Sequence, residues 1–77
     1  MDDLKTYNKK EDQPTLKEAK SFVGGLVEMV YLENDRQMLV NKKGIIHNLP
    51  VNYPASFVAG NIILGPALIL EGDARWD

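Results

Sequence analysis

The sequence predicts an α+β fold in which a short N-terminal helix packs on a small, mostly antiparallel sheet of four or five strands. Three observations predict it. A capped amphipathic segment spans residues 15–23, short apolar runs separated by turn residues follow it, and 77 residues make one domain. The chain has no cysteine and one histidine, which excludes disulfides and Cys/His zinc sites and leaves packing and self-association to stabilise a small core.

Residues 1–13 are mostly polar and show no periodicity, which predicts a flexible N-terminal arm ahead of a single domain at 14–71. The helix should start at a capping box, in which the Thr15 hydroxyl accepts from the amide of Glu18 and the Glu18 carboxylate reaches back. Gly24-Gly25 supplies the left-handed residue that ends the helix. A helix of about two turns is not stable alone, so it must pack on the sheet.

The segments after the helix are expected to form strands. Residues 26–33 are apolar on both faces, which is typical of a central strand or of a strand at an interface. Residues 37–41 return as its hairpin partner after a turn at Asn34-Asp35. Residues 45–47 start a third strand after a second turn, in which Gly44 is expected to have a positive φ.

Two prolines prevent residues 48–54 from forming a strand interior, so a shaped loop and then a helical turn over 54–59 are expected. Residues 61–70 should form the last strand, bent or bulged at Gly65-Pro66. This strand is almost wholly apolar, so both of its faces need cover. The helix covers one face, and a second copy is expected to cover the other, which predicts a homodimer or a higher oligomer.

Residues 72–77 are expected to form a polar C-terminal tail.

Charge and hydropathy exclude several classes of protein. The net charge of −2 has the wrong sign for a non-specific nucleic-acid binder, so nucleic acid is not an expected partner. The first residues lack the basic and apolar regions of a signal peptide. The longest apolar run, residues 62–70, is too short to span a bilayer, so no membrane partner is expected. The sequence thus predicts a cytoplasmic protein.

Four short motifs occur in order along the chain. They are V-G-G-x-x-E at residues 23–28, N-x-x-G at 41–44, L-P-x-N at 49–52 and I-x-G at 63–65. Together they resemble a bacteriophage and mobile-element family known as a domain of unknown function, over about residues 15–70. The resemblance implies a small phage-encoded accessory protein in the host cytoplasm, and it implies no reaction.

One motif departs from the pattern of that family. The family has acidic residues in the N-x-x-G turn, where this chain has Lys42-Lys43. No role of acidic turn residues can therefore be carried over to this chain.

The sequence contains no set of residues typical of catalysis. His47 has no cysteine to activate and is expected to be structural or solvent-facing. Ser21 and Ser56 lack the G-x-S-x-G context of a hydrolase, and neither nucleotide-binding glycine motifs nor metal-ligand spacings are present. Glu28 shares a strand face with apolar residues, where it is either partly buried or, as is more common, directed to an edge. We therefore expect a protein that is not an enzyme and has no cofactor or metal.

Polar recognition is expected on the proline-shaped loop, because rigid loops commonly carry binding residues. Asn48, Asn52 and Tyr53 are the candidates there, with capping of the following helical turn as the alternative role of Asn52. Trp76 is a further candidate that either anchors a partner or folds back onto the domain.

The Asn41-Lys42-Lys43-Gly44 turn is a candidate anion site. Lys42, Lys43 and Gly44 could form a nest of amides with two cations beside it, and the alternative is an ordinary solvated turn.

Two function classes follow. The first is non-enzymatic binding of a host protein, to redirect host metabolism or to block a defence system. The alternative is an oligomer that binds and sequesters a nucleotide or another anion.

Overall fold

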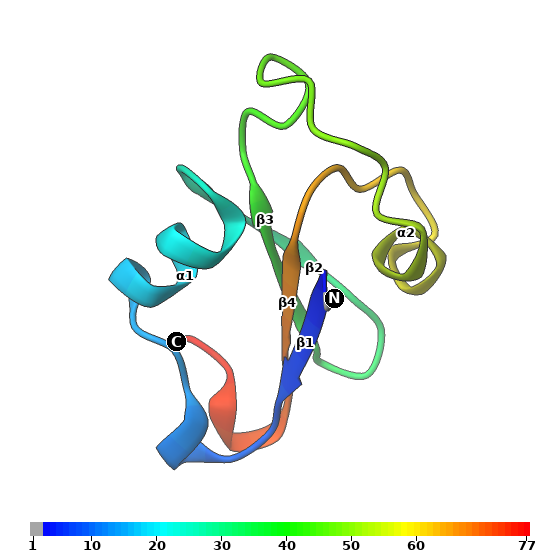
Figure 1. Cartoon of the computed structure of the whole chain (residues 1–77). Helices are drawn as coiled ribbons and strands as arrows, with labels where there is room; N and C mark the ends of the chain where they lie inside the picture. The colour runs from blue at the N-terminus through cyan, green and yellow to red at the C-terminus, as the bar shows by residue number, and fades with distance from the viewer. Residues whose placement is uncertain (1–2) are drawn as a thin grey trace.

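A four-stranded sheet lies between two helices in the computed structural model, which describes residues 3–77 (Figure 1). The strand order is β1-β4-β3-β2, in which β1 runs parallel to β4 and the other neighbours are antiparallel. The predicted α+β class is confirmed, although the sheet is mixed. The elements are β1 (Leu4–Tyr7), η1 (Lys10–Asp12), α1 (Leu16–Val23), β2 (Val27–Tyr31), β3 (Gln37–Asn41), α2 (Tyr53–Ala59), β4 (Ala67–Leu70) and η2 (Gly72–Ala74).

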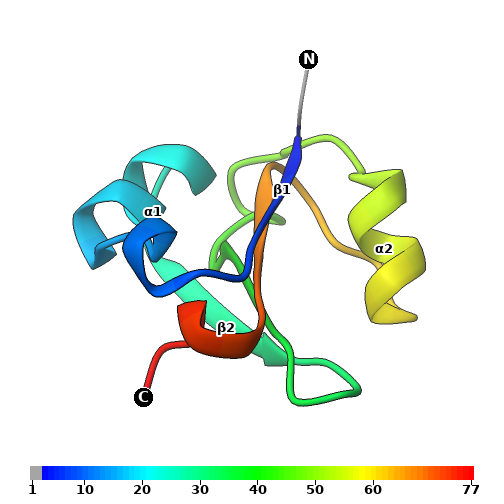
Figure 2. The ribbon, with the colours of Figure 1, turned by 90° about the horizontal axis from the view of Figure 1, so that it is seen from below.

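Strand β4 is the centre of the core, and all four of its residues are buried. Leu68 and Leu70 pack in the cluster on the α1 face, whereas Ala67 and Ile69 pack in the cluster on the α2 face. The two helices lie on opposite sides of the sheet, as Figure 2 shows from below. Both faces of β4 are therefore covered by the chain itself, and the second copy that was expected to cover one of them is not needed there.

Helix α1 forms as its sequence predicts. The Glu18 amide donates to Thr15 Oγ1 at 3.1 Å, and the Thr15 amide donates to Glu18 Oε1 at 2.8 Å, which completes the capping box. Gly24 ends the helix with a φ of 85°, a conformation that glycine adopts without a Cβ penalty. Ala19 and Val23 are buried against the sheet, which supplies the stability that two helical turns lack.

The predicted flexible arm at residues 1–13 contains a strand instead. Strand β1 extends the sheet beside β4: Ala67 N donates to Asp3 O at 2.8 Å and Glu71 N donates to Tyr7 O at 3.0 Å. Only two of its four residues are partly buried, so the apolar pattern is too weak to predict a strand. The pairing depends on backbone groups of β4, which no local sequence signal reveals.

The predicted third strand at residues 45–47 is a series of turns, and the prediction was wrong. His47 N donates to Lys43 O and Leu49 N donates to Gly44 O, so the backbone bonds close locally. The position beside β3 is already filled by β4. Gly44 also lacks the expected positive φ. A Cβ there would come within 3.1 Å of the Leu64 Cβ, so a larger residue would have to displace Leu64 slightly.

The last strand is shorter than predicted, because regular pairing starts only at Ala67. Gly65 has a φ of 81° and turns the chain just before that residue, which agrees with the expected bend. Ahead of the bend, Leu64 makes only an isolated bridge to Val51. The helical turn predicted at 54–59 is confirmed as α2.

Strand β2 lies at the edge of the sheet and not at its centre. The register pairs Glu28 with Val40 and Val30 with Met38, so these side chains share the α2 face. Val27, Met29 and Tyr31 alternate with them and lie on the α1 face.

The Asn52 side chain joins three separate segments. Its Nδ2 donates to Asp3 O and to Gly65 O, each at 2.8 Å, and its Oδ1 accepts from the Ala55 amide at 3.1 Å. The residue is therefore the N-cap of α2, which was the alternative role considered for it, and it also holds the start of β1 against the bend before β4.

Replacing Asn52 should destabilise the protein strongly. Asn52→Ala removes the cap and leaves buried backbone groups unpaired, so we expect a loss of about 3 kcal/mol in the free energy of unfolding. Urea unfolding followed by circular dichroism measures it. The matched control is Asn8→Ala, at an exposed position, which should change stability by less than about 0.5 kcal/mol. Equal effects of the two substitutions would contradict this role of Asn52.

Two left-handed glycines provide a matched test of close packing. A Cβ at Gly65 would lie 2.7 Å from Leu49 Cδ1, whereas nothing lies within 4 Å of one at Gly60. Gly60→Ala should cost about 1 kcal/mol for its backbone conformation, and Gly65→Ala should cost about 2 kcal/mol, because Leu49 must also move. In a Leu49→Ala background the cost of Gly65→Ala should fall to that of Gly60→Ala. A constant cost in both backgrounds would show that Leu49 is not the cause.

Candidate functional site

The four residues predicted to bind a partner do not form one surface. Tyr53 is exposed at the start of α2, on one side of the sheet. Trp76 packs against the cluster on the opposite, α1 side. Asn48 is exposed in the turns at 42–48 with a φ of 55°, and Asn52 is buried.

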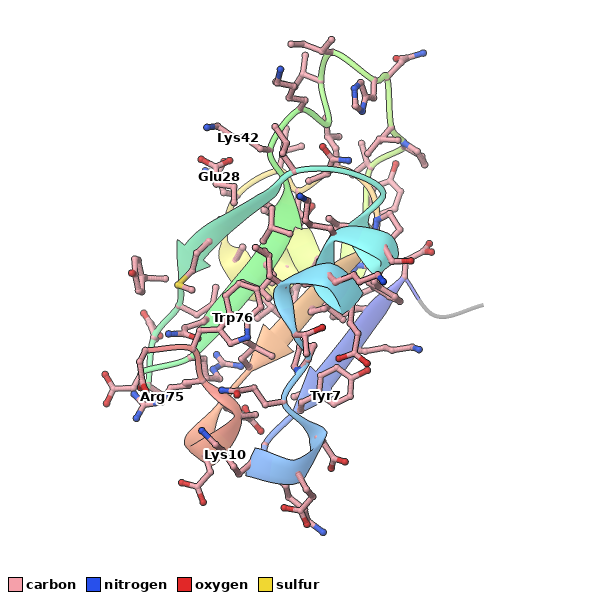
Figure 3. The ribbon with its side chains drawn as sticks, turned by 90° about the vertical axis from the view of Figure 1, so that its left-hand side faces the viewer. Tyr7, Lys10, Glu28, Lys42, Arg75 and Trp76 are labelled. Atoms are coloured by element: carbon pink, nitrogen blue, oxygen red, sulfur yellow. The ribbon has the colours of Figure 1, made fainter. Side chains whose placement is uncertain are left out.

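Trp76 is held by the fold, which was the second of the two roles considered for it. Its amide donates to Gln37 Oε1 at 2.7 Å, and Gln37 Nε2 donates back to the Trp76 carbonyl at 2.7 Å. The indole Nε1 donates to Pro14 O at 3.0 Å. Figure 3 shows the ring lying over the sheet beside α1. These bonds bring the predicted polar tail onto the domain.

The predicted amide nest at Lys42, Lys43 and Gly44 is already occupied by bonds within the chain. Lys42 N donates to Leu26 O, Lys43 N donates to Asn41 Oδ1 at 2.8 Å, and Gly44 N donates to Asn41 O at 3.3 Å. None of these three amides is directed to a ligand. The two lysine side chains are exposed, so they remain as charges on the surface.

A groove of about 700 Å³ adjoins these lysines at the end of the sheet. Strands β2 and β3 form one wall, the turns after β3 form the second, and the segment before the Gly65 bend forms the third. Its lining residues are Glu28, Val30, Val40, Asn41, Lys42, Lys43, Gly44, Ile45, Ile46, Asn61, Ile62, Ile63 and Leu64.

Three isoleucines give the groove an unusually exposed apolar rim. Ile45 is 83% exposed, Ile46 is 76% exposed and Ile62 is 73% exposed. The close approach of Gly44 to Leu64 brings the two loops that carry them together. Contiguous exposed apolar side chains beside charged groups are typical of a protein interaction site.

Two groups of opposite charge mark the sheet end of the groove. Glu28 and Lys42 lie near each other there in Figure 3. Their register explains the placement, since Glu28 pairs with Val40 and Lys42 follows two residues after it on the same face. Glu28 is exposed on an edge strand, in agreement with the more common of the two roles considered for it.

Across residues 3–77, no group of three or more His, Cys, Asp or Glu residues could hold a metal ion. His47 is exposed on the turns. None of the helices in this range is both long and apolar enough to cross a membrane.

Sequence reasoning missed the isoleucine rim. The sequence predicts that Ile45-Ile46 lie in one strand and Ile62 in another, and not that the three side chains meet at one exposed rim. The available signal was the short spacing between Gly44 and Pro50, which leaves little room for a paired strand.

A comparison with known protein families identifies the family of the chain. The chain matches the family described as domain of unknown function DUF3846 over residues 2–77. No curated protein and no solved structure matches it. The match covers nearly the whole chain, including β1 and the tail that carries Trp76, and the chain therefore belongs to the DUF3846 family.

Proposed function

We propose that this chain is a small accessory protein of phage type that acts by binding a partner protein, and that the groove receives a short segment of that partner. The partner belongs to the host, where binding changes a metabolic protein or a defence system. The groove carries the proposal, because it places three exposed isoleucines beside two lysines. The phage origin rests on the order of the four sequence motifs.

The apolar rim supplies the binding free energy. Covering a fully exposed isoleucine contributes about 1.5–3 kcal/mol, so three of them contribute roughly 5–9 kcal/mol against the cost of association and of ordering a short peptide. The turns that carry Ile45 and Ile46 are closed by backbone bonds, so the rim is largely formed before binding.

The charges at the rim determine which segments fit. Lys42 and Lys43 attract carboxylates, and Glu28, which lies beside Lys42 at the sheet end, reduces that attraction there. The preferred segment has two or three large apolar residues followed by aspartate or glutamate on the lysine side. Both lysines are exposed, so added salt should weaken binding.

Sequestration of a nucleotide or another small anion is the alternative. The exposed lysines support it, but the amides of the turn are used inside the chain, and an anion site built of side-chain ammonium groups alone is weak. The groove favours a ligand that is mainly apolar.

Selection from a random peptide library should distinguish these possibilities. We expect enriched peptides to contain adjacent apolar residues followed by acidic ones, with dissociation constants of roughly micromolar order. Fluorescence anisotropy of a labelled peptide measures the affinity. The double variant Lys42→Glu with Lys43→Glu should weaken binding by at least about tenfold, which is 1.4 kcal/mol.

The matched control for charge is Lys9→Glu with Lys10→Glu, which makes the same change on exposed residues of another surface. It should leave the affinity within about twofold. Ile46→Ser should also weaken binding, and because this side chain is exposed, it should not change the thermal midpoint of unfolding. Failure to enrich any peptide, or equal effects of both lysine pairs, would contradict the proposal. A nucleotide that raises the thermal midpoint would favour the alternative.

A further inference from the structure

The outer edge of β2 carries unused backbone hydrogen-bonding groups. Within residues 3–77, no strand pairs with that edge, since the sheet order ends at β2. Lys42 N donates to Leu26 O and Leu32 N donates to Arg36 O at the two ends of the β2–β3 ladder. Antiparallel bonds alternate between residues, so the even-numbered residues of β2 bond inward. The N–H and C=O groups of Val27, Met29 and Tyr31 therefore point outward.

These outward groups are arranged symmetrically about the middle of the strand. Met29 is the central residue of β2, and Val27 and Tyr31 lie two positions to either side. A second copy of β2, running antiparallel, can pair Met29 with Met29 and Val27 with Tyr31. Every outward N–H and C=O then has a partner, and the pairing obeys a two-fold axis. Shifting one strand by two residues leaves the backbone groups of one end residue on each strand without a partner.

We propose that this chain forms a homodimer through the edges of β2, with the two-fold axis passing between the Met29 residues. The pairing uses backbone groups of β2 and needs no ligand in the groove, although the Glu28 and Val30 side chains of this strand also line the groove. It differs from the oligomer expected from the sequence, in which a second copy covered the last strand.

The side chains of this register are compatible on both faces. On the α1 face, Val27 meets the partner's Tyr31, an aromatic and β-branched pair, and the two Met29 side chains meet each other. Tyr31 is 79% exposed in the single chain, so it has surface to lose on association. On the α2 face, Glu28 lies opposite the partner's Val30, so no like charges are directly opposed.

The strand also lacks most of the features that prevent edge pairing. Natural edges are blocked by proline, lysine or bulges. The five residues Val-Glu-Met-Val-Tyr contain only one charge, and the ladder with β3 continues through all of them without a bulge. By contrast, the other edge strand, β1, carries a lysine in its four residues. Pairing at β2 makes one continuous sheet in which Val30 of each copy extends the wall of the other copy's groove.

Cysteine cross-linking tests the register directly, because the chain has no other cysteine. In the proposed dimer, two cysteines at position 29 have Cα atoms about 5.5 Å apart, within disulfide range. Two cysteines at position 31 are four residues out of register, about 14 Å apart, and out of range. Met29→Cys should therefore form a disulfide dimer at least about tenfold faster than Tyr31→Cys under a glutathione redox buffer, although position 31 is more exposed.

Non-reducing electrophoresis measures the rate, and circular dichroism of the reduced variants checks that both fold. Light scattering of the wild-type protein at tens of micromolar should give a mass above the 8.6 kDa of one chain that falls on dilution. Met29→Lys should return it to a monomer, because two ammonium groups would face each other, while Leu16→Lys on the exposed surface of α1 should not. Equal cross-linking at positions 29 and 31, or a mass of 8.6 kDa for the wild type, would overturn the proposal.

Discussion

The side chain of Asn52 joins parts of the chain that the sequence separates widely. One amide group caps α2, holds the carbonyl that precedes β1, and holds the carbonyl of Gly65 at the bend into β4. A buried amide is stable only when its donors and acceptor are all paired, so the three segments must be in place together. The order of β1 beside β4, the position of α2 and the shape of the loop before β4 all depend on this group.

Other tertiary contacts determine where surface remains for a ligand. The tail closes the α1 face through the paired amides of Gln37 and Trp76. The bend at Gly65 and the close packing of Gly44 on Leu64 hold two loops beyond the end of the sheet, and their isoleucines have no core to enter. Rigid loops with uncovered apolar residues thus adjoin a sheet whose strands are fixed by the core.

Capping residues, turn residues and short apolar runs predicted the elements whose boundaries are set by neighbouring residues in the sequence. The capping box at Thr15 and the left-handed Gly24 gave α1 correctly, and apolar runs separated by turn residues gave β2 and β3. Strand β1 could not be found in this way, because its bonds come from β4 and its own side chains are mostly exposed. The site was only partly predictable. Lys42 and Lys43 line the groove, but the backbone amides of their turn bond within the chain. Trp76 bonds to Pro14, which is distant in the sequence, so its role could not be decided from local signals.

The pairing of β1 with β4 also has a consequence during synthesis. The first and last strands are neighbours although about 60 residues separate them, so closing the sheet closes nearly the whole chain into one loop. On the ribosome, helix α1 and the β2–β3 hairpin can form early, but β1 has no neighbour until Leu70 has left the exit tunnel. Until then the edge of β3 that pairs with β4 remains open, so the sheet is completed only when β4 is available.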